Sequence, residues 1–266
     1  MKNLSNKVIW ITGASSGIGE ALVYALAKEG ALLILSARRA DELKRVYEQN
    51  GLSADKAHIL PLDLNNASNF EEKKNEVLAK FGRIDILVNN GGVSQRSLAQ
   101  DTTLAVDRQL FEVNYFGTVA LTKTVLPQFV SQQDGLIVTV TSAVAKYGTP
   151  WRSTYSATKH ALHGFFDSLR AELYKDNVRV LLVCPGFIRT NITLHALTGN
   201  GEKLGSMDNL TARGLTATEC ARQIVAAIKS EKEEVVVSRF LEKFGVYVKR
   251  FFPSLFSVMI RKMEVR

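Results

Sequence analysis

Ser142, Tyr155 and Lys159 are the residues whose types and spacing most directly suggest chemistry in this chain. Tyr155 and Lys159 are four residues apart, so on a helix they share one face. A free tyrosine has a pKa of about 10, too high for easy proton exchange near neutrality. A nearby ammonium favours the phenolate, so we predict that Lys159 lowers the pKa of Tyr155. Tyrosine and lysine also occur at this spacing as ordinary exposed pairs on helices. The other motifs of the chain must therefore show whether Tyr155 and Lys159 are catalytic.

A glycine-rich turn follows the first apolar run, in the stretch "TGASSGIG". Gly13, Gly17 and Gly19 let the backbone approach a pyrophosphate closely, and a helix N-terminus after them offers unpaired N–H groups. The spacing differs from the commoner dinucleotide fingerprint, so this turn alone does not identify a nucleotide site. It predicts a phosphate-binding turn between a strand and a helix.

Arg38 and Arg39 stand about where NAD-binding sites carry an acidic residue for the ribose 2′-hydroxyl. An acidic side chain would repel a 2′-phosphate, whereas a guanidinium group attracts it. We therefore predict NADP(H) in preference to NAD(H). The alternative is that both arginines are solvated surface charges.

Short apolar runs alternate with amphipathic stretches along most of the chain, which predicts an α/β fold. The strand runs are fully apolar, so both faces of a parallel sheet should be covered by helices. We expect one doubly wound domain of three layers with seven strands, at 7–12, 32–37, 58–63, 84–90, 136–141, 178–183 and 234–238. The helical patterns lie at 17–29, 40–50, 68–81, 103–130, 155–174 and 217–230. Thr216 and Glu219 form a capping-box pattern before the last of these.

Taken together, these motifs resemble the short-chain dehydrogenase/reductase family, whose members share a Rossmann fold. The matches, in the family's order, are "TGASSGIG" (12–19), "NNGG" (89–92), Asn114 in "FEVNYFG", Ser142, "YSATK" (155–159) and "PGFIRT" (185–190). The resemblance covers residues 7 to about 238. Gly91 departs from the alanine usual there, a change that an adenosine site tolerates.

The resemblance assigns catalytic roles to Asn114, Ser142, Tyr155 and Lys159. Tyr155 would be the general acid or base, and Ser142 would hold the substrate oxygen beside it. Lys159 would also bond the nicotinamide ribose, and Asn114 would hold a water that relays protons. The implied reaction interconverts a secondary alcohol and a ketone, with NADP(H) carrying the hydride.

The resemblance also implies which residues contact the cofactor. These are Gly13, Ser15, Ser16, Gly17, Ile18, Gly19, Arg38, Arg39, Asp63, Leu64, Asn89, Gly91, Tyr155, Lys159, Pro185, Gly186, Ile188 and Thr190. Asp63 and Leu64 would lie at the adenine and Asn89 and Gly91 at its ribose, while the residues from Pro185 onward would meet the nicotinamide. Asp85 is predicted to be structural, and His160 and His163 are predicted to be packing or surface residues.

We assign residues 1–239 to the catalytic domain and 240–266 to a basic, apolar tail. Within the domain, 191–215 lacks periodicity and is predicted to be a mobile loop over the substrate. The tail carries six basic and two acidic residues and keeps helical apolar spacing, with a break expected near Pro253. Packing on the body or on another subunit is favoured slightly over a membrane-surface anchor and over a flap above the substrate.

The formal net charge is +8, and the tail supplies half of it, which argues against a nucleic-acid partner. Cys184 and Cys220 lack metal-ligand spacing, so no metal is predicted and both thiols should be reduced in a cytoplasmic protein. No apolar run is long enough for a membrane span. The predicted partners are a small carbonyl or alcohol substrate, apolar or lipid-like, and further copies in a homodimer or homotetramer. A catalytically silent nucleotide sensor, and C=C reduction or epimerisation at the same residues, remain as alternatives.

Overall fold

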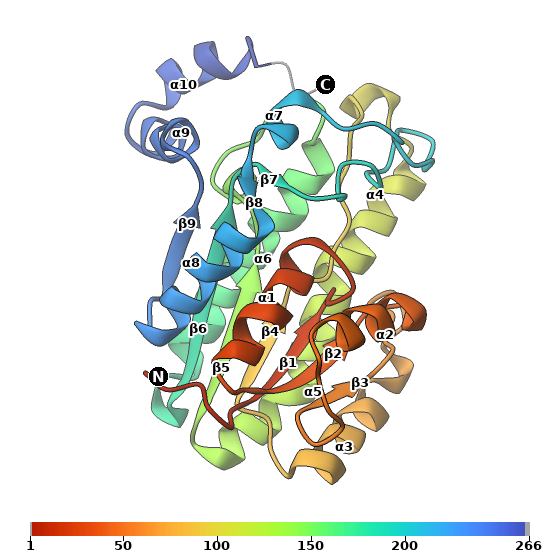
Figure 1. Ribbon diagram of the computed structural model, residues 1–266. Coiled ribbons are helices and arrows are strands. Elements are labelled where there is room, and N and C mark those ends of the chain that lie inside the picture. The colour runs from red at the N-terminus through yellow and green to blue at the C-terminus, as the bar shows by residue number, and fades with distance from the viewer. Residues whose placement is uncertain (1, 264–266) are drawn as a thin grey trace.

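A single sheet of seven parallel strands forms the centre of the computed structural model, which describes residues 2–263 (Figure 1). The strands are β1 (Val8–Thr12), β2 (Leu32–Ser36), β3 (Ala57–Ile59), β4 (Ile86–Asn89), β5 (Gly135–Val140), β6 (Val178–Pro185) and β9 (Glu234–Val237). Their order is β3-β2-β1-β4-β5-β6-β9, so the chain changes direction between β1 and β4. Ligands of doubly wound sheets bind outside the carboxyl ends of the strands at such a switch point.

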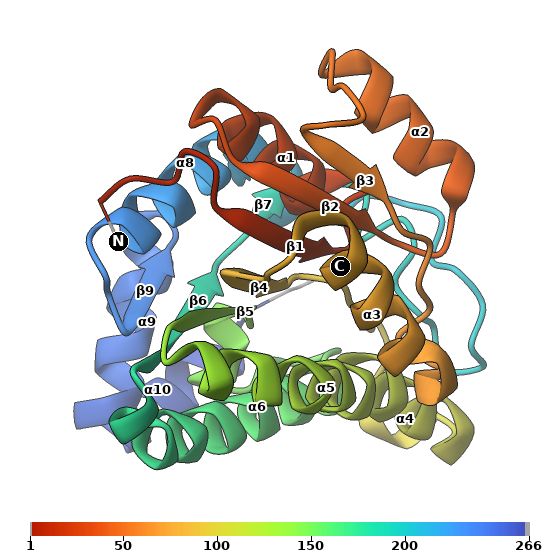
Figure 2. The same cartoon turned by 90° about the horizontal axis from the view of Figure 1, so that it is seen from below.

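Helices cover both faces of the sheet, which confirms the predicted three-layer α/β fold (Figure 2). One face carries α1 (Gly17–Lys28), α2 (Ala40–Gln49) and α8 (Ala217–Lys229); the other carries α3 (Phe70–Phe81), α5 (Gly117–Gln132) and α6 (Ser153–Glu172). Because both faces are buried, β1 and β5 are apolar along nearly their whole length. The predicted structural role of Asp85 is confirmed, since its carboxylate accepts the Val8 N–H at 2.8 Å.

Two predicted elements differ from the structure. The strand expected at 58–63 is β3, which is assigned only over Ala57–Ile59, although the Leu60 and Leu62 N–H groups still donate to the Leu35 and Ala37 carbonyl oxygens beyond it. The helix expected at 103–130 is divided into α4 (Leu104–Phe111), a π-helical turn (Glu112–Phe116) and α5. The π turn directs the buried Asn114 side chain towards Val93, where its Oδ1 accepts the Val93 N–H and its Nδ2 donates to the Val93 carbonyl oxygen.

Residues 191–215 contain no long helix or strand, in agreement with the predicted lack of periodicity. The two ends of the segment nevertheless lie side by side. The short strands β7 (Ile188–Arg189) and β8 (Leu215–Thr216) pair in parallel and bring its two ends together. The segment contains one short helix, α7 (Asn209–Ala212), and β8 leads directly into α8 through the predicted capping box of Thr216 and Glu219.

The tail forms two helices, α9 (Phe240–Phe251) and α10 (Pro253–Ile260), which lie beyond β9 at one corner of the molecule (Figure 1). The predicted break is confirmed, with Pro253 at the first position of α10. Val248 and Phe256 are buried against Tyr147, whereas other large apolar side chains of the two helices, Phe240 and Phe251 among them, are exposed. Among residues 2–263, no helix combines the length and apolarity that crossing a bilayer requires.

Candidate active site

A cavity of about 520 Å³ lies at the carboxyl ends of the central strands. Most of the predicted site residues line it, namely Gly13, Ser15, Ser16, Gly17, Ile18, Arg38, Arg39, Asp63, Leu64, Gly91, Ser142, Tyr155, Lys159, Pro185, Gly186, Ile188 and Thr190. Gly19, Asn89 and Asn114 are not on its wall. Residues at the carboxyl ends of six strands, β1 to β6, and residues of segment 191–215 therefore meet around one space.

The glycine turn forms the part of the wall next to α1. Gly13 and Gly17 have φ angles of +66° and +59°, which side chains with a Cβ rarely adopt. Gly19 serves packing instead, because a Cβ there would lie 2.1 Å from the Gly13 carbonyl oxygen. The Ser16 side chain makes no capping hydrogen bond, and the first N–H groups of a helix have no carbonyl partner within it. This end of the cavity is built to receive an anion.

Asn89 is the predicted cofactor residue whose side chain points elsewhere. It is buried and donates to Thr122 Oγ1 at 2.9 Å, between β4 and α5. Its neighbour Asn90 lies on the cavity wall, where its Nδ2 donates to the Thr12 carbonyl oxygen at 3.0 Å. Successive side chains of a strand point to opposite faces, so only one of the two asparagines can face the cavity.

Arg38 and Arg39 follow β2 and lie exposed on the rim of the same cavity. Within residues 2–263, neither side chain forms an ion pair. Arg39 precedes the first residue of α2, so its backbone is held by the start of that helix. Both guanidinium groups are thus free to meet a ligand.

Ser142 and Tyr155 place two hydroxyl groups on the wall after β5 and at the start of α6. Ser142 Oγ accepts a hydrogen bond from the Val144 N–H at 3.3 Å, which fixes its rotamer at the end of the strand. Burial raises the pKa of the Tyr155 phenol, and the charge of Arg152 opposes that rise more strongly than the Ser142 hydroxyl does. The phenol is therefore protonated at neutral pH, contrary to the predicted lowering by Lys159.

Lys159 lies one helical turn after Tyr155, but its ammonium does not reach the phenol. Nζ donates to the Val140 carbonyl oxygen at 3.2 Å and lies 5.7 Å from the centre of the Tyr155 ring. Burial lowers the pKa of Lys159 to about 8. A Cβ at Gly92 would lie 2.9 Å from Asn114 Oδ1 and 3.7 Å from Lys159 Nζ, so the glycine keeps the space between them open.

Three residues of the site carry no sequence motif. Gln95 is fully buried, and its Oε1 accepts the N–H groups of Thr154 and Tyr155 at 3.0 and 3.1 Å, which caps α6 and orients Tyr155. Arg96 and Arg152 are buried on the cavity wall. Long-range packing brings these residues together, and nothing in the local spacing could have indicated them.

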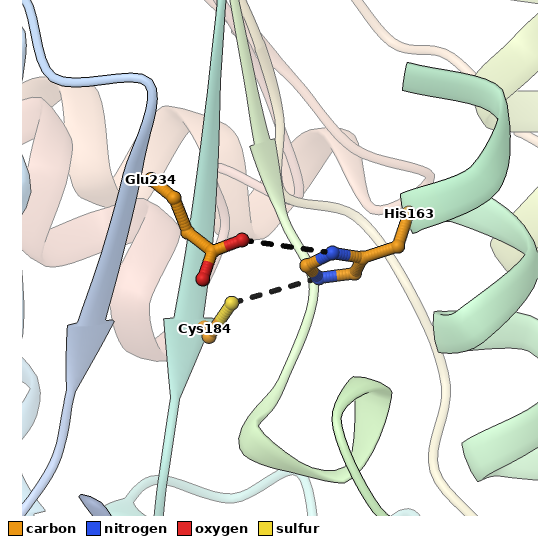
Figure 3. A group of neighbouring side chains, drawn as sticks. All are labelled: His163, Cys184 and Glu234. Atoms are coloured by element: carbon orange, nitrogen blue, oxygen red, sulfur yellow. Dashed lines mark hydrogen bonds and ion pairs between the residues drawn. The ribbon is translucent and has the colours of Figure 1, made fainter. Parts of the chain in front are cut away.

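His163, Cys184 and Glu234 form a group beside the active site that could be mistaken for a metal centre (Figure 3). The imidazole lies between its two partners, with Nε2 3.5 Å from the Cys184 sulfur and Nδ1 3.9 Å from a Glu234 oxygen. The Lys146 ammonium already pairs with that oxygen at 2.6 Å, and its positive charge opposes a metal cation at this position. Burial raises the pKa of the Cys184 thiol to about 12, so the group is a packing contact of α6, as predicted for His163.

Comparison with known proteins agrees with this geometry. The family model described as short chain dehydrogenase matches residues 7–200. The human protein "Dehydrogenase/reductase SDR family member 7" is 43% identical over 94% of this chain and 76% of its own length.

Two solved structures share the architecture. A short-chain dehydrogenase/reductase from Burkholderia phymatum in complex with NAD has a TM-score of 0.85 at 22% identity, over 96% of each chain. An alcohol dehydrogenase from Thermococcus sibiricus complexed with 5-hydroxy-NADP has a TM-score of 0.74 at 27% identity, over 89% of this chain and 97% of its own. The chain belongs to the short-chain dehydrogenase/reductase family of oxidoreductases.

Proposed function

We propose that this oxidoreductase interconverts a ketone and a secondary alcohol with NADP(H), on a substrate with an apolar body. The observation that carries the proposal is that the hydroxyls of Ser142 and Tyr155 share one cavity wall with Lys159 and the glycine turn. Apolar side chains, among them Val113, Phe187 and Ile192, line the same space. Such a cavity brings a proton donor and a phosphate-binding turn to the two ends of one site.

The residues present fit a nicotinamide dinucleotide. The uncapped N-terminus of α1 would hold its pyrophosphate, and a Cβ at Gly17 would come within 3.1 Å of Thr190 Cγ2, so only glycine leaves this approach open. When bound, the cofactor supplies or accepts a hydride at its nicotinamide ring. We infer the phosphorylated form because Arg38 and Arg39 stand unpaired at the end of β2.

The side chains handle the proton. Tyr155, protonated at neutral pH because burial raises its pKa, donates to the carbonyl oxygen in the direction of reduction. The Ser142 hydroxyl donates a hydrogen bond to the same oxygen and holds it beside the phenol. The guanidinium of Arg152, whose charge opposes the rise in the pKa of Tyr155, stabilises the phenolate that remains. Asn114, beside the open space at Gly92, would hold the water through which the proton is replaced.

A panel of ketones and alcohols, followed by NADPH oxidation or NADP reduction, tests the proposal. Tyr155→Phe should abolish turnover and leave NADPH binding, measured by calorimetry, largely intact. Tyr147→Phe is the matched control, because Tyr147 is equally buried nearby but is not on the cavity wall. Near-normal turnover by Tyr155→Phe on any accepted substrate would remove Tyr155 from the mechanism. If the unmodified protein turns over no substrate of the panel, the result would favour a catalytically silent protein.

A further inference from the structure

Two arginines are buried in the wall of the active-site cavity, close to Tyr155. Arg96 follows β4 and Arg152 precedes α6, and each is only 7% exposed. Both line the cavity, and the charge of each acts on the Tyr155 phenol. Arginine is almost never buried without a partner, because removing its charge from water is costly.

The two guanidinium groups share a single carboxylate, that of Asp208 in segment 191–215. Arg96 Nη2 donates to Asp208 Oδ2 at 2.7 Å, and Arg96 Nη1 donates to Ser94 Oγ at 2.9 Å. Arg152 Nη2 lies 3.8 Å from the same carboxylate oxygen, which is too far for a hydrogen bond. Asp208 thus neutralises Arg96, and the wall keeps the positive charge of Arg152.

Of the two arginines, Arg152 has the larger number of unpartnered atoms, since only Nε lacks a partner in Arg96. The Nε and Nη2 atoms of Arg152 are buried and make no hydrogen bond with any residue of 2–263. Its guanidinium carbon lies 5.1 Å from the centre of the Phe187 ring, which holds the guanidinium plane in place. Trp151, directly before it, has a φ of +67°, a conformation that non-glycine residues adopt only where the surroundings enforce it.

Asp208 lies behind the cavity wall, and the described residues that line the wall around Arg152 include no acidic side chain. Lys203 and the hydroxyl residues Thr193 and Thr211 line the cavity from segment 191–215. The acidic side chain on the wall is Asp63, which follows β3, and β2, β1 and β4 separate that strand from β5. Because the Thr193 and Thr211 hydroxyls donate to Asp208, this region offers an occupant the positive charge of Arg152 and, from segment 191–215, of Lys203.

We propose that the physiological substrate carries an anionic oxygen group, a carboxylate or a phosphate, and that Arg152 binds this group beside Tyr155. This inference rests on the proposed carbonyl reduction. A planar guanidinium matches the paired oxygens of either group. Arg96 acts through Asp208, whose bonds from Arg96 and Thr211 outweigh burial and hold its pKa low, so this carboxylate stays charged and keeps segment 191–215 in place. The apolar wall receives the remainder of the substrate.

Matched substrates that differ only in charge test the proposal. We would compare kcat/KM with NADPH for 3-benzoylpropionate against its methyl ester, and for phenacyl phosphate against 2-hydroxyacetophenone. One charge-assisted contact predicts a preference of about 10- to 100-fold for the anionic member of at least one pair. The pair that shows the larger preference identifies carboxylate or phosphate as the group.

Arg152→Met should remove this preference, whatever it does to the rate on both members of a pair. Arg108→Met, which removes an exposed arginine of α4, should leave the ratio unchanged. Asp208→Asn should strengthen binding of the anionic member, since it removes the carboxylate that competes for Arg152. Should Arg152→Met fail to fold, Asp208→Asn alone decides.

Equal activity on charged and neutral members, or an unchanged preference in Arg152→Met, would overturn the anion site while leaving carbonyl reduction intact. If no ketone is reduced, the proposed function fails and calorimetry decides the site. In that case 3-benzoylpropionate and phenacyl phosphate are titrated into the protein with NADPH present. Binding of either by the unmodified protein, weakened at least tenfold by Arg152→Met, supports the site, and equal or undetectable binding overturns it.

Discussion

Replacing His163 with glutamine should make the protein less sensitive to acid. Burial is the main cause that lowers the pKa of His163 to about 4, and the charge of Lys146 adds to it. In the unfolded chain a histidine has a pKa of about 6.5. As the pH falls from about 6.5 to about 4, His163 binds a proton in the unfolded chain but stays neutral in the folded protein. The free energy of unfolding therefore begins to fall at about pH 6.5. Most of the stability that depends on the neutral His163 is lost by about pH 4.

A shift from 6.5 to about 4 corresponds to about 3 kcal/mol of stability lost on acidification. Urea unfolding of the unmodified protein, His163→Gln and His160→Gln at about pH 7 and about pH 4.5 measures it. Glutamine can present its amide near the Nε2 position, 3.0 Å from Thr141 Oγ1, and takes up no proton. His160 is the control because it is exposed on the same helix.

Other groups also titrate on acidification, so only the difference between these proteins is informative. We expect His163→Gln to lose about 2–3 kcal/mol less than the other two proteins over this interval. Equal losses in all three proteins would refute the argument, because they would mean that the folded protein accepts a proton on His163. If zinc raises the melting temperature of the unmodified protein, the interpretation of His163, Cys184 and Glu234 in Figure 3 as a packing contact would be wrong.

Three further predictions concern the cofactor and the tail. Arg38→Asp should narrow or reverse the preference for NADP(H), shifting the affinity ratio by roughly 10- to 100-fold in calorimetry at low salt; equal affinities in the unmodified protein would contradict the assignment. NADPH binding should weaken as pH rises through about 8, where Lys159 loses its charge in the free protein, and Lys159→Met should flatten this profile; identical profiles would exclude Lys159 as the cause. Truncation after Ser238 removes the buried Val248 and Phe256, so it should lower the melting temperature or change the oligomeric state seen by sedimentation. Binding of the full-length protein to anionic vesicles that weakens with salt, with an unchanged oligomer after truncation, would instead identify a membrane anchor.

Features fixed by local chemistry were predictable from the sequence. The glycine turn between β1 and α1, the capping box before α8 and the break at Pro253 each depend on a few adjacent residues. The apolar runs also identified all seven strands of the sheet, because strands buried on both faces have no polar alternation to obscure them.

The same continuous apolarity hides which side of a strand faces the cavity. Asn89 and Asn90 were equivalent by sequence, and only the structure shows that Asn89 turns towards Thr122. The pKa of Tyr155 was predicted in the wrong direction because it depends on burial and on Arg152, not on helical spacing to Lys159 alone. Arg152 and its distant neighbour Asp208 meet only after folding.

The closure of segment 191–215 at its base has a consequence for how enzymes of this kind diversify. Ile188 pairs with Leu215 and Arg189 with Thr216, so the segment leaves and rejoins the body at nearly one point. Everything it adds to the cavity, from Asn191 to Thr211, can be exchanged without moving a strand of the main sheet. The segment can therefore be exchanged as a unit. Grafting it from one relative into another should transfer substrate preference, while the recipient protein retains its own cofactor-binding residues.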